Sequence, residues 1–282
     1  MSRKVAIVTD STGAFPASMI EELKLSIVPL NIHWDGTNYV DFVDITPAEF
    51  YKKLASSKTL PTTSQPSAAA FADVFEKLLS QDYDILTLPF SSRLSGTYYS
   101  AMMAAAQFPT GRIEILDTLF ASVPLSAIVI KAARAALKGA TLLECSNIAK
   151  DVASRTKVYF AVETLEYLHK GGRINTAAAF LGTALNLKPI LELKDGVIIP
   201  VERVRTSRKA HQRLLELAEQ TVGPHGKIEF LGLVSADARE AVEELREEAH
   251  KRFQIEEELV TDLSAVLGCH VGNGTIGLSF LA

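Results

Sequence analysis

Residues 84–108, DILTLPFSSRLSGTYYSAMMAAAQF, contain the pattern that decides the fold. An apolar run at 84–90 is followed by hydroxyl-bearing residues and a glycine, and then by residues of helical composition. Short apolar runs bounded by turn residues are typical of buried strands, and serine or threonine ahead of a helical run is typical of a helix start. The stretch therefore predicts a strand, a turn and a helix at 98–108.

The same order of patterns recurs through the N-terminal half of the chain. An apolar run at 5–9 is followed by the helix-capping residues 10–13, and another run at 112–117 precedes a predicted helix at 121–137. Further helices are predicted at 67–79 and 142–154. Strands that alternate with helices of about ten or more residues imply crossover connections and a mainly parallel sheet.

The second half of the chain has a different pattern. Apolar runs at 190–193 and 197–204 are joined by Lys194-Asp195-Gly196, and Asp-Gly between two such runs indicates a hairpin. This half is therefore predicted to contain a mixed or antiparallel sheet. The other elements expected here are strands at 157–162, 228–234 and 275–281 and helices at 164–170, 175–187, 207–220 and 236–253.

The length of the chain, 282 residues, exceeds the usual size of a single domain. We predict an α/β protein with two domains and a ligand site between them. Residues 1–156 would form an N-terminal α/β domain with a mainly parallel sheet and flanking helices. Residues 157–282 would form a C-terminal α+β domain with a mixed sheet.

The composition excludes several classes of protein. Apolar residues make up 48% of the chain and the net charge is −4, which gives no reason to expect a nucleic-acid partner. The apolar run before Asp10 is too short for a signal peptide, and no later run reaches the roughly 18 to 20 residues that cross a bilayer. We expect a cytoplasmic protein, and therefore free thiols at Cys145 and Cys269.

Four polar stretches interrupt the apolar sequence, and they suggest the function. They lie at 62–67 (TTSQPS), 91–97 (SSRLSGT), 170–174 (KGGRI) and 268–277 (GCHVGNGTIG). Together they supply hydroxyls, glycines, arginines and a histidine, which can hold an anion, and almost no carboxylates for acid/base catalysis. The stretch 91–97 lies between a buried strand and a helix, where backbone N–H groups and the helix dipole attract anions. The sequence favours binding of an anion over hydrolysis.

Each candidate residue also has a structural interpretation. Ser95 could donate to an anion or cap the following helix. Arg173 could bind a carboxylate or phosphate with its planar guanidinium, or it could be a solvated charge after a helix that ends at Gly171-Gly172. His270 could donate to an anion, move a proton or serve the fold alone.

The aspartates do not form a catalytic or metal-binding set in the sequence. Asp10 ends the first predicted strand, where a ligand crevice would open, but capping the next helix together with Ser11 and Thr12 is the favoured role. Asp41 and Asp44 lie in a segment that we interpret as an exposed edge. No metal site is predicted.

Two further chemistries are not favoured. Cys269 lies beside His270, but adjacent residues of an extended segment point in opposite directions, which argues against a thiol nucleophile. The chain has no GxxxxGK[ST] loop, and GNGTIG at 272–277 precedes a strand instead of opening a helix. We do not expect the chain to bind ATP.

Seven segments in this order resemble the DegV family, whose members include the fatty-acid-binding subunit (FakB) of bacterial fatty acid kinase. The resemblance spans the whole chain. The matching segments are VAIVTDSTGAFP at 5–16, PTTSQPS at 61–67, SSRLSGTYYSA at 91–101, VETLEYLHKGGRI at 162–174, LNLKPIL at 185–191, VRTSRKA at 204–210 and GCHVGNGTIGL at 268–278.

The resemblance implies a carrier that buries a long-chain fatty acid as its ligand and presents the carboxylate to a separate fatty acid kinase, which makes an acyl phosphate. Such a carrier needs no cofactor and no membrane segment, although it allows transient contact with a membrane surface. The residues that the resemblance implies for the carboxylate are Thr62, Thr63, Ser95, Gly96 and His270, and those for kinase docking or phosphotransfer are Arg173, Arg205 and His270. The family pattern HxGPG reads His270-Val-Gly-Asn273-Gly here.

Two other functions compete with the carrier. One is an acyl hydrolase that would use Ser95 or Cys269 with His270, although Leu94-Ser95-Gly96 lacks the preceding glycine of a G-x-S-x-G elbow. The other is a lipid-binding sensor that regulates another protein.

Overall fold

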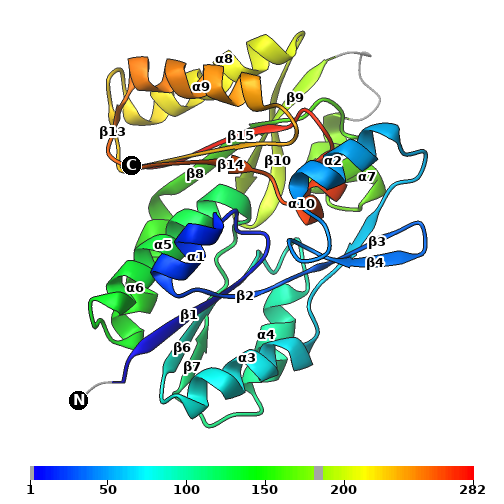
Figure 1. Cartoon of the computed structure of the whole chain (residues 1–282). Coiled ribbons are helices and arrows are strands. Elements are labelled where there is room, and N and C mark those ends of the chain that lie inside the picture. Colours follow the sequence, from blue (N-terminus) through cyan, green and yellow to red (C-terminus); the bar gives the residue numbers. More distant parts are fainter. Residues whose placement is uncertain (1–2, 181–186) are drawn as a thin grey trace.

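The computed structural model of the chain describes residues 3–180 and 187–282. Four parallel strands in the order β2-β1-β6-β7 form the first sheet (Figure 1). These strands are β1 (Val5–Asp10), β2 (Ser26–Val28), β6 (Asp84–Leu88) and β7 (Ile113–Ile115). The mainly parallel sheet predicted from the alternating pattern is confirmed.

Helices cover both faces of this sheet. The helices α1 (Ala17–Leu23), α5 (Ser122–Leu137) and α6 (Leu142–Arg155) pack on one face, and α3 (Ala68–Ser80) and α4 (Thr97–Ala105) pack on the other. In α6, Thr141 and Glu144 form a capping box, which fixes the start of that helix.

The second sheet has six strands in the order β10-β9-β8-β15-β12-β14, with both parallel and antiparallel pairs. Its strands are β8 (Thr156–Ala161), β9 (Lys188–Lys194), β10 (Val197–Val204), β12 (Phe230–Ser235), β14 (Glu258–Asp262) and β15 (Ile276–Leu281). The predicted Asp-Gly hairpin joins β9 and β10, and Asp195 and Gly196 both have positive φ angles, 50° and 79°. Positive φ at both positions suits the tight turn of a hairpin.

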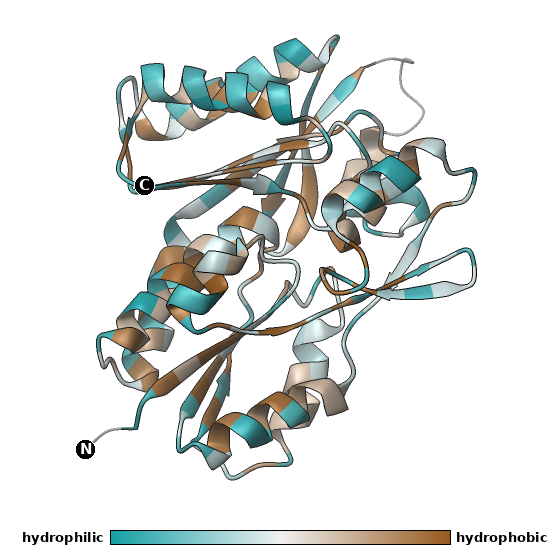
Figure 2. Ribbon diagram, in the orientation of Figure 1, coloured by the Kyte–Doolittle hydropathy of each residue, from teal (hydrophilic) through white to brown (hydrophobic). Residues whose placement is uncertain are grey.

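The outer face of the six-stranded sheet carries α8 (Ser207–Val222) and α9 (Arg239–Arg252), and α5 packs on the inner face. Figure 2 shows the outer sides of α8 and α9 as largely hydrophilic, whereas the strands beneath them are hydrophobic. Beyond this sheet, β11 (Lys227–Ile228) and β13 (Gln254–Ile255) form a short parallel pair.

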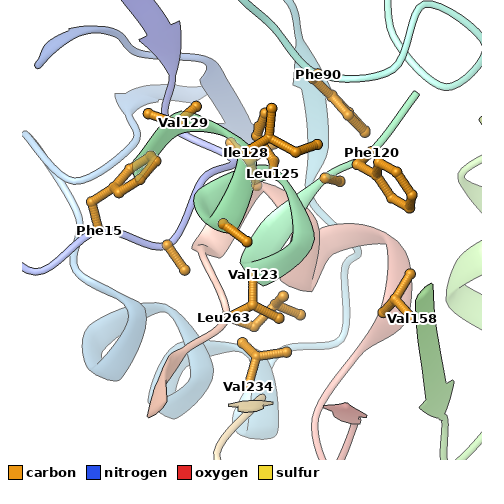
Figure 3. Close-up of a cluster of buried hydrophobic side chains, with 14 of the residues drawn as sticks. Phe15, Phe90, Phe120, Val123, Leu125, Ile128, Val129, Val158, Val234 and Leu263 are labelled. Carbon is orange, nitrogen blue, oxygen red and sulfur yellow. The ribbon is translucent and has the colours of Figure 1, made fainter. Parts of the chain in front are cut away.

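Helix α5 is the central element of the molecule because it contacts both large sheets. Eleven of its 16 residues are buried, as expected for a helix that is covered on all sides. Figure 3 shows Val123 and Leu125 of α5 in one cluster with Val234 of β12 and Leu263. The main core therefore joins the two halves of the chain.

A third sheet lies beside the pocket and was not predicted from the sequence. It is antiparallel, in the order β4-β3-β5, and we call it with its helix the small sheet unit (residues 31–64). Its elements are β3 (Asn31–Trp34), β4 (Thr37–Val40), α2 (Pro47–Ser56) and β5 (Thr62–Ser64).

The small sheet unit packs against α10 (Ala265–Val271), which comes from the end of the chain. Tyr51 of α2 donates a hydrogen bond from its hydroxyl to the Leu263 carbonyl at 3.1 Å. A Cβ atom at Gly268 would lie 2.6 Å from a ring carbon of Phe50, so glycine is required for this close approach. The contact links two segments that are distant in sequence.

Several expectations differ from the structure. Residues 175–187 were predicted as one helix, but Asn175–Phe180 is a short 3-10 helix, and residues 181–186 lie outside the described part of the chain. The segment around His270 is not extended but helical, in α10. The helix α7 (Glu166–Lys170) ends at Gly171, as predicted.

The second sheet begins with β8 at Thr156. The domain boundary between residues 156 and 157 stays a prediction. Within the described residues, no helix is both long enough and apolar enough to span a membrane.

Candidate functional site

A mostly apolar pocket lies between the first turn of α5, the inner face of the six-stranded sheet and α10. Its cavity volume is about 110 Å³. Val123, Val158, Val234 and Leu263 line it and are seen in Figure 3. The apolar lining is that of a site for a small molecule with a large hydrophobic part.

One part of this pocket is polar. Thr63, Ser95, Arg173 and His270 all line it, although they come from β5, the loop before α4, the segment after α7, and α10. The Thr63 hydroxyl and the Nε2 atom of His270 are 2.8 Å apart and form a hydrogen bond. The structure thus brings these four predicted residues to one cavity. Their role in binding a carboxylate stays a prediction.

Of the two adjacent threonines of β5, only Thr63 lines the pocket. Thr63 pairs with Ile32 and Thr62 with His33 across the neighbouring strand β3. Successive side chains of a strand point to opposite faces, so Thr62 points away from Thr63, and it is exposed. Thr62 is not among the residues that line the cavity.

Ser95 lies in a loop that is held by a buried aspartate. The Asp10 carboxylate accepts hydrogen bonds from the Phe90 N–H at 2.6 Å and from the Thr12 N–H at 2.9 Å and hydroxyl at 2.6 Å. These bonds tie the end of β1 to the end of β6, where the Ser95 loop starts. Asp10 therefore does not cap the next helix, whose N-cap is Pro16.

Ser95 lines the pocket but is not the N-cap residue of the following helix, which was the other role that the sequence left open. Its hydroxyl accepts from the Thr97 N–H at 3.3 Å and lies 2.8 Å from the Thr97 hydroxyl, while Gly96 is the N-cap residue of α4. A Cβ atom at Gly96 would lie 2.7 Å from the side-chain nitrogen of Gln65. Glycine at this position lets the Gln65 side chain pack closely against the Ser95 loop.

Arg173 is not a solvated surface charge. Its guanidinium donates to the Leu94 carbonyl at 3.2 Å and to the Gly171 carbonyl at 2.6 Å. A guanidinium has five N–H donors, and no carboxylate forms an ion pair with Arg173 among the described residues. A positioned cation without an acidic partner, lining a cavity, is suited to an anionic ligand.

His270 is neutral at physiological pH. Burial, and secondly the positive charge of Arg173, lower the pKa of His270 to about 4. Its Nδ1 atom is buried without a hydrogen-bond partner among the described residues, and a Cβ atom at Gly171 would lie 2.4 Å from it. At the polar end of the pocket His270 is therefore a neutral hydrogen-bonding group, whereas Arg173 carries a permanent charge.

The contacts of Ser95, His270 and Cys269 differ from those of a paired nucleophile and base. Ser95 is hydrogen-bonded to Thr97, and His270 is hydrogen-bonded to Thr63. In the described residues no hydrogen bond joins Ser95 to His270. Burial, with the charge of Asp41, raises the pKa of the Cys269 thiol far above its usual range. Cys269 is therefore a protonated core residue at neutral pH, and a nucleophile needs the thiolate.

The expected exposed edge around Asp41 was wrong for that residue. Asp41 is fully buried, and burial raises its pKa to about 7. Asp44 accepts a hydrogen bond from the Val40 N–H at 2.7 Å. No cluster of three or more metal-ligating side chains occurs in residues 3–180 and 187–282.

Arg205 lies away from the pocket. It is exposed in the connection between β10 and α8, and it does not line the cavity. Its role in docking stays a prediction.

Several pocket residues were not predicted as site residues, among them the polar residues Gln65 and Ser122. Gln65 belongs to the polar stretch TTSQPS, which is the signal that could have identified it. Ser122 also lines the pocket, and the run Ala-Ser-Val-Pro at the start of a predicted helix gives only a weak indication.

The family model described as "Uncharacterised protein, DegV family" matches residues 4–282 of the chain. A DegV domain-containing protein of Halalkalibacterium halodurans is 34% identical over 278 residues, which cover 98% of each chain.

Solved structures are similar over nearly the whole length. The structure of a DegV family protein from Thermus thermophilus, described by its fatty acid binding, is 36% identical with a TM-score of 0.92 and covers 99% of each chain. DegV of Bacillus subtilis, described as a fatty acid binding protein, is 29% identical with a TM-score of 0.86 and covers 100% of each chain.

Proposed function

This chain belongs to the DegV family, and we propose that its pocket binds a long-chain fatty acid and presents the carboxylate to a separate fatty acid kinase. The kinase brings ATP and transfers the terminal phosphoryl group to a carboxylate oxygen, which yields an acyl phosphate and ADP. In this proposal the chain is a carrier, and the bound acid is its ligand.

The observation that carries the proposal is the distribution of polarity in the pocket. A fatty acid has one anionic end and a long hydrocarbon chain, so its site needs a few clustered donors and a long apolar remainder. Thr63, Ser95, Arg173 and His270 are such donors, and the other residues of the cavity are mostly apolar. The Thermus and Bacillus relatives, which are described by their fatty acid binding, support the same ligand class.

The hydrocarbon chain supplies most of the binding free energy. Each buried CH2 group contributes about 0.8 kcal/mol, so sixteen carbons offer on the order of 12 kcal/mol before the costs of ordering are subtracted. Hydrogen bonds to the carboxylate add less, and their main effect is to fix which end of the acid faces the kinase.

The polar end of the pocket is also suited to presentation. Arg173 is held by two backbone carbonyls, so its remaining N–H groups can contact the carboxylate or the incoming phosphoryl group. Arg205 is exposed and its side chain forms no hydrogen bond or ion pair to a described residue, which leaves it free to contact the kinase. The chain lacks a nucleotide-binding loop, so the phosphoryl donor would come with the partner.

The direct test is mass spectrometry of an organic extract from protein that was purified without added lipid. We expect about one long-chain fatty acid per chain. Delipidated protein that is mixed with excess palmitic acid and then passed over a desalting column provides the control for lipid lost during purification. If neither sample contains a stoichiometric acid, the carrier function is wrong.

A further inference from the structure

The start of α5 lines the pocket and has no capping side chain. Ser122, Val123 and Pro124 form its first turn, are buried and line the cavity. The N-cap residue is Ala121, which has no side-chain acceptor. Because α5 has 16 residues, this end carries a partial positive charge and unpaired backbone N–H groups.

Two hydrogen-bond donors in this turn have no partner among the described residues. The hydroxyl of Ser122 is buried and unpaired, and the residue is only 8% exposed. The Ser122 N–H donates to the Thr12 carbonyl at 3.0 Å, whereas the Val123 N–H forms no hydrogen bond to another described segment. A buried donor without an acceptor is costly, so a donor that lines a cavity indicates a ligand atom that accepts from it.

Ser122 has a backbone conformation that is unfavourable for serine. Its φ angle is 59°, in the left-handed region that serine rarely adopts. The hydrogen bond of its N–H to Thr12, and the bond from the Ser126 hydroxyl to its carbonyl at 3.2 Å, maintain this conformation. A residue keeps such an unfavourable backbone conformation only where the contacts around it fix that conformation.

The Ser122 hydroxyl forms no hydrogen bond with Thr63, Ser95 or His270 in the described residues. Its neighbours in the chain on the pocket wall are Ala121, Val123 and Pro124, which are apolar. Ser122 also belongs to a different element from the donors that we assign to the carboxylate, which lie in β5, the loop before α4, the segment after α7 and α10. The pocket therefore has a further hydrogen-bond donor besides those residues.

We propose that the pocket accepts long-chain acids that carry an oxygen substituent on the hydrocarbon chain, a hydroxyl or an oxo group, and that the Ser122 hydroxyl donates a hydrogen bond to this oxygen. The positive end of α5 favours an oxygen acceptor at the same place. The inference rests on the proposed function and adds a class of fatty acid to it. It makes Ser122 a specificity-determining residue.

The test compares stearic acid with a series of hydroxystearic acids that differ in the position of the hydroxyl. Displacement of a fluorescent fatty acid gives the affinity of each acid for the parent protein and for Ser122→Ala. At the matching position we expect the variant to lose about tenfold in affinity for the hydroxylated acid, since one hydrogen bond is lost. The affinity for stearic acid should change by less than about threefold.

Two further variants complete the design. Ser122→Gly also removes the hydroxyl but suits the positive φ angle, so it replaces Ser122→Ala if that variant does not fold. Ser64→Ala is the matched control: Ser64 lines the same pocket, but its hydroxyl is paired with His33 at 2.8 Å. The ratio between hydroxylated and plain acid should stay at the parental value in Ser64→Ala.

The other outcomes overturn the inference. Equal loss of stearic and hydroxystearic acids in Ser122→Ala would place Ser122 at the carboxylate. No effect for any hydroxylated isomer would mean that the hydroxyl meets no ligand oxygen. Both results would leave fatty acid binding intact, whereas a parent protein that binds none of the acids would overturn the proposed function as well.

Discussion

The two basic side chains at the polar end of the pocket differ in charge. Arg173 is a fixed cation, while His270 is neutral because burial and Arg173 lower its pKa to about 4. The two residues therefore contribute differently to an anionic ligand, one by charge and the other by a hydrogen bond. This difference decides two of the predictions that concern single residues.

Ser95→Ala should weaken retention of the carboxylate by about 1.5 to 3 kcal/mol, which is typical of a hydrogen bond to a charged group. Titration with a fluorescent fatty acid measures the loss. Ser92→Ala is the matched control, because Ser92 belongs to the same loop but does not line the pocket. If Ser95→Ala binds fatty acid as tightly as the parent, Ser95 does not hold the carboxylate.

Arg173→Ala and His270→Ala should reduce phosphorylation of the bound acid by the kinase more than they reduce lipid binding, because the buried hydrocarbon chain dominates the affinity. Lipid exchange and kinase assays on the same preparations would measure both effects. Arg173→Lys retains the charge but loses the planar pair of donors, so it separates charge from geometry. Equal losses in the two assays would contradict the assigned roles.

His270 should also make the stability of the protein depend on pH. Its pKa is about 4 in the native state and about 6.5 when unfolded, so between these values only the unfolded chain takes up the proton. The stabilising contribution is therefore complete above pH 6.5 and falls as the pH decreases towards 4. Between pH 7 and pH 4.5 the loss is about 2 kcal/mol.

Urea unfolding at these two pH values tests this dependence. In His270→Gln the difference between the two free energies of unfolding should be smaller than in the parent by about 2 kcal/mol. His169→Gln, at an exposed histidine of α7, is the control. An unchanged pH dependence in His270→Gln would show that His270 is not buried as a neutral group.

Among the elements, the contact between α2 and α10 determines where His270 lies. Gly268→Ala would place a Cβ atom 2.6 Å from Phe50 and 2.7 Å from the Tyr51 hydroxyl oxygen. Overpacking of this kind typically costs about 1 to 3 kcal/mol. We expect a lower free energy of unfolding and weaker kinase-dependent phosphorylation, because α10 carries His270.

A second substitution identifies the cause of that loss. Phe50→Leu shortens the side chain that the new methyl group meets, so the double variant should recover part of the stability lost in Gly268→Ala. Denaturant titrations of the parent, both single variants and the double variant form a cycle that gives the coupling free energy. A coupling of zero would exclude the predicted clash.

Elements with long periodic patterns could be predicted from the sequence. The strand and helix at 84–108 and helices α5 and α6 follow from local composition, and the β9–β10 hairpin follows from one Asp-Gly pair. The small sheet unit was missed because its strands have only three or four residues, and α10 was missed because it has only seven. Contacts between them, and not local propensity, stabilise these elements.

The candidate site, too, could be predicted only in part from the local sequence. The polar stretches drew attention to Ser95, Arg173 and His270, because hydroxyls, arginine and histidine are conspicuous in an apolar chain, and the resemblance to the DegV family added Thr63. The burial of Asp41 could not be read from its neighbours, since it results from the packing of the small sheet unit on α10. Ser122 is prominent only through its backbone angle and its unpaired hydroxyl, which are properties of the folded chain.

On the scale of the whole molecule, α5 makes the pocket a shared structure of both halves. Its first turn forms part of the wall, and its body packs between the parallel sheet and the six-stranded sheet. A ligand in the pocket would therefore touch elements from both halves at once. Binding to the folded state alone would stabilise the entire molecule, by an amount that grows with the concentration of free ligand.

The position of β15 has a consequence for synthesis in the cell. This strand, Ile276–Leu281, lies between β8 and β12 in the middle of the six-stranded sheet, although it is the last strand in sequence. The ribosome must have translated Leu281 before the six-stranded sheet can form completely and α10 can pack beside Thr63. A chain cut short by a premature stop codon before Ile276 would leave β8 and β12 without the strand between them, and the pocket wall to which Gly277 contributes would be incomplete.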